Sequence, residues 1–72
     1  EIVAKYVREN IVFLAPEDAV LGGTFYALGV KLDPFLKTGV FSYEDGHIMG
    51  SASFSYTRNG QEVLISDIKK IN

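Results

Sequence analysis

The chain has 72 residues, 47% of them hydrophobic, with four tyrosines, five phenylalanines and only two prolines. This length suits one domain, and the composition is that of a packed globular protein rather than a disordered tail. Seven basic and nine acidic residues leave a net charge of -2 without a long run of either sign, which argues against a surface that binds nucleic acid. Cysteine is absent, which excludes disulfides and thiolate-metal sites.

The first residue is Glu1 rather than methionine, so we expect that a preceding segment was removed: an export signal, a membrane anchor or simply sequence added for expression. The longest uncharged stretch runs from Ala19 to Val30 and has 12 residues. A helix that spans a membrane needs roughly 18 or more apolar residues. We therefore expect no membrane insertion by this segment.

Two helices are predicted near the start of the chain. Apolar residues recur at helical spacing, with charged residues between them, so an amphipathic helix is expected over 1–11, with a continuation toward Leu14. Its apolar face carries Ile2, Val3, Tyr6, Val7 and Ile11. A short second helix is predicted over 16–22, because a proline and two acidic residues stand where a helix begins and a glycine where it ends.

Four strands follow in the prediction. The first spans 24–32, where Tyr26, Leu28, Val30 and Leu32 alternate with the other residues and form an apolar face. Gly29 inside this strand indicates a bulge or a close backbone approach. The three later strands are separated by Asp45-Gly46 and Asn59-Gly60, two dipeptides typical of two-residue hairpin turns.

Two-residue turns would fix the strand register. The expected opposite pairs are Tyr43 with Ile48, Tyr56 with Val63, and Phe54 with Ile65. The alternation then gives a core face of Phe41, Tyr43, Ile48, Ala52, Phe54, Tyr56, Val63 and Ile65. The opposite face holds Ser42, His47, Met49, Ser51, Ser53, Ser55, Thr57, Glu62 and Ser66, interrupted by Val40, Leu64 and Ile68. The predicted fold is α+β: a single domain over 1–72, in which an N-terminal amphipathic helix packs on a four-stranded antiparallel β-meander.

Acid-base chemistry is concentrated in Glu44, Asp45 and His47. A nucleophilic arrangement with Ser42 is disfavoured, because that residue would lie opposite Met49 and only diagonal to the histidine, roughly 7–8 Å away. A metal site is disfavoured because His47 has only two carboxylates nearby, which a tight turn points in different directions. We predict no catalytic, metal or cofactor site, and we interpret Glu44 and His47 as a cross-strand pair at a hairpin tip.

The mixed hydroxyl and apolar face is the best functional lead, because an uncovered, semi-apolar sheet face is typical of a moderate protein-protein contact. Its candidate contact residues are Met49, Ser51, Ser53, Ser55, Thr57, Leu64 and Ile68. We expect a non-catalytic protein-interaction module: an inhibitor, an adaptor or a soluble domain of an exported or anchored protein. It would bind a protein partner, or a second copy of itself, through this face or through the edge strand over 61–70.

The alternative is a small-ligand-binding domain with a pocket between helix and sheet, lined by Tyr6, Tyr26, Tyr43 and Tyr56. So small a core has little room for such a cavity. Base stacking on the sheet aromatics is not expected, because the helix should cover them and cations are scattered. An enzyme is expected least, because the acid-base inventory is poor.

Overall fold

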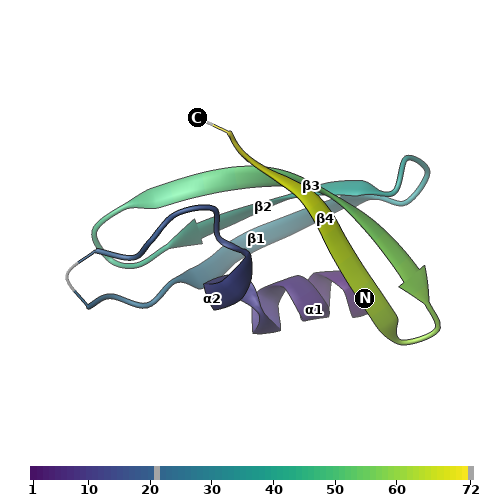
Figure 1. Cartoon of the computed structure of the whole chain (residues 1–72), viewed down its shortest axis with the longest axis horizontal. Helices are drawn as coiled ribbons and strands as arrows, with labels where there is room; N and C mark the ends of the chain where they lie inside the picture. Colours follow the sequence, from purple (N-terminus) through teal and green to yellow (C-terminus); the bar gives the residue numbers. More distant parts are fainter. Residues whose placement is uncertain (21, 72) are drawn as a thin grey trace.

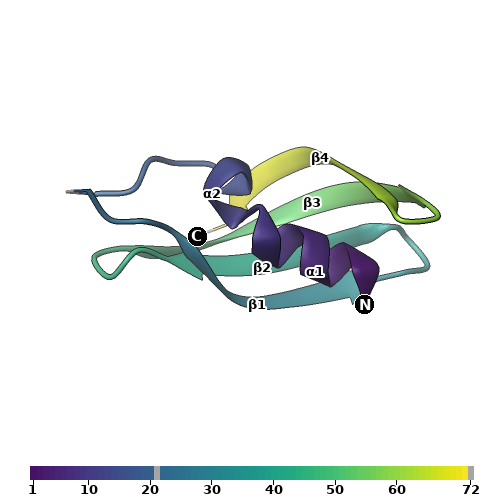
Figure 2. The same cartoon turned by 90° about the horizontal axis from the view of Figure 1, so that it is seen from below.

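The computed structural model describes residues 1–20 and 22–71. Four strands form one antiparallel sheet in the order of the chain, and helix α1 lies across one face of it (Figure 1, Figure 2). This arrangement confirms the predicted α+β meander. Within the described residues, no helix is long and apolar enough to cross a membrane. The elements are α1 (Ile2–Glu9), α2 (Ile11–Leu14), β1 (Tyr26–Asp33), β2 (Thr38–Glu44), β3 (Met49–Asn59) and β4 (Glu62–Ile71).

Helix α1 forms where the apolar spacing predicts it. The Glu1 carboxylate caps the helix by accepting hydrogen bonds from the backbone N–H groups of Val3 and Ala4. Asn10 interrupts the helical run, and its side-chain amide donates to the carbonyl oxygen of Tyr6 at 2.9 Å. Such a local bond competes with helix continuation, so the chain turns there and begins the one-turn helix α2.

The short helix predicted over 16–22 is wrong for the part of this stretch that the structure describes, which is an irregular connection. Helix α2 ends at Leu14, and Ala15 is extended (φ -60°, ψ 131°), the conformation favoured for a residue that precedes proline. Contacts with distant residues hold the connection in place: the backbone N–H of Val20 donates to Asp45, and the Glu17 carboxylate contacts Tyr43 and Lys70. These contacts replace the local helical bonds that the prediction assumed.

A bulge at Leu28-Gly29 divides β1, as the glycine indicates. Ala27 lies opposite Tyr43 and Gly29 lies opposite Ser42, so Leu28 is an extra residue without a partner. The bulge reverses which side chains face the core. Val30 packs against the core after it, whereas Tyr26 and Leu28 are 50% and 48% exposed, so their predicted place on the apolar face is wrong.

The connection between β2 and β3 is longer than predicted. Glu44 lies opposite Met49, and Tyr43 lies opposite Gly50 rather than Ile48, so the loop has four residues from Asp45 to Ile48. The hairpin between β3 and β4 is also shifted, because Tyr56 lies opposite Ile65 and its two-residue loop is Gly60-Gln61. Each register differs from the predicted one by two residues, an even number, so no β2 or β3 side chain changes face.

The second half of β4 contains another irregularity. Ser55 of β3 lies opposite Ser66, but Ser53 lies opposite Lys69, so β4 has one extra residue between these pairs. Asp67 adopts a positive φ of 53° at this point. The bulge turns Ile68 toward the core, where it packs against the buried cluster, so its predicted place on the opposite face is wrong.

The core lies between α1 and the sheet. The predicted core residues of β2 and β3 are all buried. Their aromatic rings and that of Phe25, a buried residue before β1 that was not predicted in the core, form a continuous row with centroid separations of 5.0–6.2 Å. This places the sheet aromatics under the helix, as predicted. The buried cluster consists of Val3, Val7, Ile11, Phe25, Phe41, Tyr43, Ala52, Phe54 and Tyr56.

Candidate functional site

Glu44, Asp45 and His47, the three acid-base residues singled out in the sequence, do not form a common site. Glu44 accepts a hydrogen bond from the Tyr26 hydroxyl at 2.5 Å, and this bond raises the pKa of Tyr26. The Asp45 side chain is buried, whereas His47 is exposed. The predicted Glu44–His47 cross-strand pair is wrong, because Glu44 lies opposite Met49 and the histidine belongs to the four-residue loop.

Asp45 holds two parts of the chain together. One carboxylate oxygen accepts hydrogen bonds from the backbone N–H groups of His47 and Ile48, each at 2.8 Å. The other accepts from the backbone N–H of Val20 at 2.7 Å. These bonds, led by those from Ile48 and Val20, lower the pKa of Asp45 to about 2. The carboxylate is thus a structural acceptor and has little capacity left for chemistry.

The depressed pKa of Asp45 predicts a specific loss of stability in acid. A carboxylate with a lowered pKa in the folded state stabilises the fold fully above its unfolded pKa and stops doing so as pH falls through the folded value. The Asp45 contribution should therefore disappear between about pH 4 and pH 2. Urea midpoints measured across this range should fall less steeply for Asp45→Asn, which is already destabilised at neutral pH. Asp18→Asn, an exposed acid of the neighbouring connection, serves as the control and should follow the unmodified protein.

A second polar cluster fastens the 15–20 connection to the sheet. The Tyr43 hydroxyl donates to the Glu17 carboxylate at 2.5 Å, and the Lys70 ammonium lies 3.1 Å from the same oxygen. Burial and the bond to Glu17 raise the pKa of Tyr43 to about 12, while Tyr43 and Lys70 lower the pKa of Glu17. Gly50 leaves space for the phenol, since a Cβ there would lie 2.6 Å from the Tyr43 hydroxyl. Sequence reasoning missed this cluster because its members are far apart in the chain.

Ser42 and the possible metal ligands were the other groups considered for chemistry from the sequence. Ser42 lies opposite Ser51 rather than Met49, and their hydroxyl oxygens are 3.0 Å apart. In the described part of the chain, no group of three or more histidine, aspartate and glutamate residues is placed to hold a metal ion.

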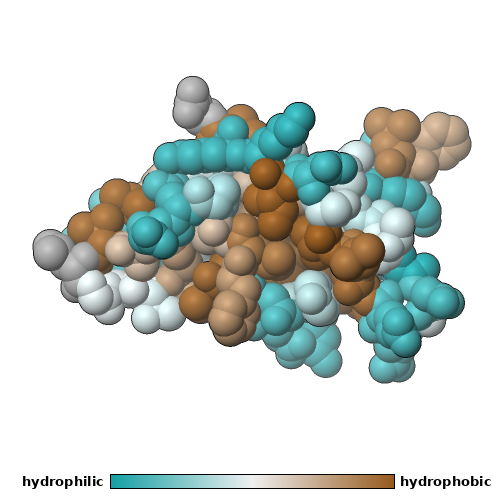
Figure 3. All heavy atoms as spheres, viewed as in Figure 1, coloured by the Kyte–Doolittle hydropathy of each residue, from teal (hydrophilic) through white to brown (hydrophobic). Residues whose placement is uncertain are grey.

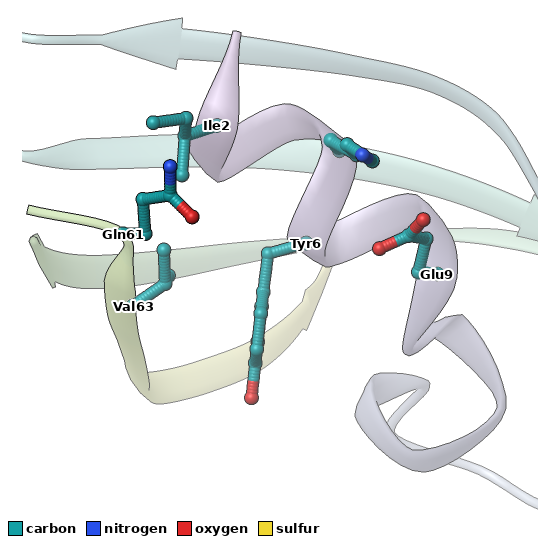
Figure 4. A pocket seen from close by; sticks show the side chains of 6 residues that line it. Ile2, Tyr6, Glu9, Gln61 and Val63 are labelled. Carbon is teal, nitrogen blue, oxygen red and sulfur yellow. The ribbon is translucent and has the colours of Figure 1, made fainter.

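The four tyrosines do not share a cavity. Tyr43 and Tyr56 are buried in the core, and Tyr26 is half exposed beside Glu44. Only Tyr6 lines the hollow between α1 and β4, which has a volume of about 260 Å³ (Figure 4). The tyrosine-lined pocket of the ligand-binding alternative therefore lacks its geometric basis.

The uncovered face of the sheet, which we call the outer face, carries most of the predicted contact residues. Met49 and Leu64 are 67% and 66% exposed, and none of the described residues lies over them. The serine and threonine side chains of β3 stand between these two apolar residues, at positions Ser51, Ser53, Ser55 and Thr57. Ile68 is the one predicted member that the β4 bulge removes to the core side.

A hollow of about 450 Å³ lies at the end of the outer face where β3 begins. We call it the outer hollow; it is lined by Leu28, Ser42, Met49, Gly50, Ser51, Lys70 and Ile71. Sequence reasoning found Met49 and Ser51 but missed Leu28 and Ile71. Leu28 becomes accessible through the β1 bulge, and Ile71 comes opposite Ser51 only through the β4 bulge.

No protein-family model matches this chain, and no curated protein or solved structure is significantly similar to it. Its function must therefore be inferred from its own surfaces.

Proposed function

We propose that this chain is a non-catalytic protein-interaction module that binds a protein partner through the outer face of its sheet, at the outer hollow. The observation that carries the proposal is the exposure of apolar side chains on a sheet face that the described residues leave uncovered. An antiparallel sheet ordinarily presents polar side chains to water on its second face. Large exposed apolar side chains grouped on one face favour a binding surface over a solvated one.

The composition of the outer hollow favours a protein partner. Leu28, Met49 and Ile71 supply apolar area, while the Ser42 and Ser51 hydroxyls can exchange hydrogen bonds with a backbone or a polar side chain. A thioether adapts its shape to different partner side chains. An apolar centre with polar groups at its rim is the usual anatomy of a protein-protein contact.

Binding can be tested with variants that change only exposed side chains. A partner captured from the native source is identified by mass spectrometry and then titrated calorimetrically against the purified chain. Met49→Ser should weaken binding roughly tenfold or more, because truncating an anchor residue at the centre of a contact has effects of that size. Phe35→Ser is the matched control, since Phe35 is 92% exposed in the β1–β2 turn, away from the outer hollow.

Both variants should keep the unfolding midpoint of the unmodified protein, because neither side chain is buried. Equal affinities of the two variants for the captured partner would place the contact elsewhere and would contradict the proposal.

A further inference from the structure

The sheet has two edge strands, β1 and β4, and they differ in how they are protected. An edge strand presents unpaired backbone groups, so folded proteins blunt edges with bulges, charges or covering segments. Strand β1 contains the Leu28-Gly29 bulge and Lys31, and α1 packs against it. The second half of β4 contains the Asp67 bulge, Lys69 and Lys70.

The first half of β4 has no bulge and no basic residue, and its only charge is Glu62 at the start of the strand. Val63, Leu64, Ile65 and Ser66 carry no charge, and their pairing with β3 is regular. Figure 2 shows this half of β4 at the margin of the sheet, with no drawn segment beyond it. A short uncharged segment of β-branched and apolar residues at an open edge is well suited to pair with another strand.

The hairpin geometry indicates which backbone groups are free. In a two-residue hairpin, the pair that flanks the loop exchanges both hydrogen bonds, and bonded and non-bonded pairs then alternate. The flanking pair here is Asn59 and Glu62. Glu62, Leu64 and Ser66 therefore direct their backbone groups toward β3, whereas Val63 and Ile65 direct theirs to the open edge.

The segment is complementary to itself in antiparallel orientation. With Leu64 on a two-fold axis, Val63 faces Ile65 of a second copy, and the reverse pairing completes four backbone hydrogen bonds. Leu64 then faces Leu64 of the second copy on the outer face, where its side chain is 66% exposed. Glu62 faces Ser66 of the second copy, so no like charges are opposed. The apolar pattern is the same in both directions, as a two-fold contact requires.

The core side of the same edge is also incompletely covered. Val63 and Ile65 are only half-buried, although they pack against the core. Apolar side chains gather along β4 in the middle of the face shown in Figure 3. Figure 4 shows Ile2 and Val63 beside the open hollow under this strand, with Tyr6 projecting from α1. An added strand would bring Ile65 of the second copy next to Val63 and cover more of this apolar surface.

We propose that Glu62–Ser66 pairs with the same segment of a second copy of this chain, joining two four-stranded sheets into one antiparallel sheet across a two-fold axis. Five paired residues bury less than the roughly 1,200 Å² of a standard interface, so the dimer forms in a concentration-dependent equilibrium. The contact shares no residue with the outer hollow, so it can fail while the proposed function stands, and the reverse also holds.

Analytical ultracentrifugation tests the dimer with two matched substitutions. The average mass of the unmodified chain should rise from one copy toward two with concentration. Leu64→Lys should abolish this rise, because it opposes two like charges across the axis and removes the apolar contact. Met49→Lys changes a residue of equal exposure on the same face but away from the edge, and should dimerise like the unmodified chain. A monomer at every concentration, or equal behaviour of the two variants, overturns the proposal.

Cysteine cross-linking tests the register directly, since the chain has no cysteine of its own. A non-bonded antiparallel pair brings opposite side chains close enough for a disulfide. Leu64→Cys should therefore form a disulfide-linked dimer several times faster than Met49→Cys under mild oxidation. An excess of the unmodified chain, which has no cysteine, should slow this reaction by competing for the β4 edge. Equal rates for the two cysteines would exclude a two-fold axis at Leu64.

Discussion

Phe41→Ala should leave half of the protein or more unfolded at 25 °C without denaturant. Phe41 is fully buried, and its ring lies 5.9 Å from that of Tyr43 and 5.7 Å from that of Phe54. Replacing a buried phenylalanine with alanine costs about 3–5 kcal/mol in lost burial and cavity formation. A core in a domain of this size rarely supplies more than about 3–5 kcal/mol, so the loss is as large as the whole free energy of unfolding or larger.

Far-UV circular dichroism and urea titration measure this loss against two comparison variants. Val40→Ala changes the neighbouring residue, which points to the outer face and is 38% exposed, and should cost below about 1 kcal/mol. Phe41→Leu removes less volume, so it should still unfold cooperatively, at a urea midpoint below that of the unmodified protein, whereas Phe41→Ala should show little or no urea transition. A Phe41→Ala variant that keeps the unmodified midpoint would show that the aromatic row is not the main source of stability.

The faces of the sheet are more predictable than its register. Alternation alone places Phe41, Tyr43, Phe54 and Tyr56 in the core, and all four are buried. Both hairpin registers differ from the predicted ones by two residues, and an even shift preserves every face. Hydrophobic burial therefore determines which side chains face the core and so excludes registers shifted by an odd number of residues. The hydrogen bonds of the loop determine which of the remaining registers forms.

The β2–β3 loop shows why that chemistry was not predictable from the local dipeptide. An Asp-Gly dipeptide such as Asp45-Gly46 favours a two-residue turn. Here the Asp45 carboxylate accepts bonds from His47 and Ile48 and widens the loop, and a third bond comes from Val20, 25 positions earlier. No local pattern contains that partner. The same reason explains why Glu17 was predicted to begin a helix although it pairs with Tyr43 and Lys70.

The two bulges determine how much of the candidate site was predicted. The β1 bulge has a sequence signal in Gly29, because glycine inside an apolar alternation is unusual. The β4 bulge has none, since Asp67 adopts a positive φ without being a glycine. Consequently the prediction places the β3 side chains on the correct face of the sheet, but it does not do so for residues beyond the β4 bulge, such as Ile68 and Ile71.

Gly39→Ala should destabilise the fold by about 1–3 kcal/mol, the usual range for overpacking a core. A Cβ at Gly39 would lie 2.5 Å from Cζ of Phe54 and 2.8 Å from the backbone carbonyl oxygen of Lys31. Neither neighbour can move easily. The Phe54 ring is held between Phe41 and Tyr56, with centroids 5.7 and 6.2 Å away, and the carbonyl belongs to the adjacent strand.

Gly29→Ala is the matched control, since a Cβ there would meet no atom within 4 Å. It should leave the urea midpoint unchanged or raise it, because alanine reduces the entropy of the unfolded chain by an amount worth about 0.4–1 kcal/mol. Equal midpoints for the two alanine variants would contradict the close packing of Gly39 on Phe54.

A double-mutant cycle separates the ring from the carbonyl as the source of the Gly39 effect. Phe54→Leu removes the ring atoms that lie 2.5 and 2.9 Å from the added Cβ but leaves the Lys31 carbonyl in place. If the ring is the main obstacle, Gly39→Ala should cost less in the Phe54→Leu background, with a coupling of about 0.5–3 kcal/mol. Glycine weakens a strand interior, so its presence in the middle of the sheet requires a compensating gain. The close approach of the Phe54 ring to the β2 backbone supplies that gain.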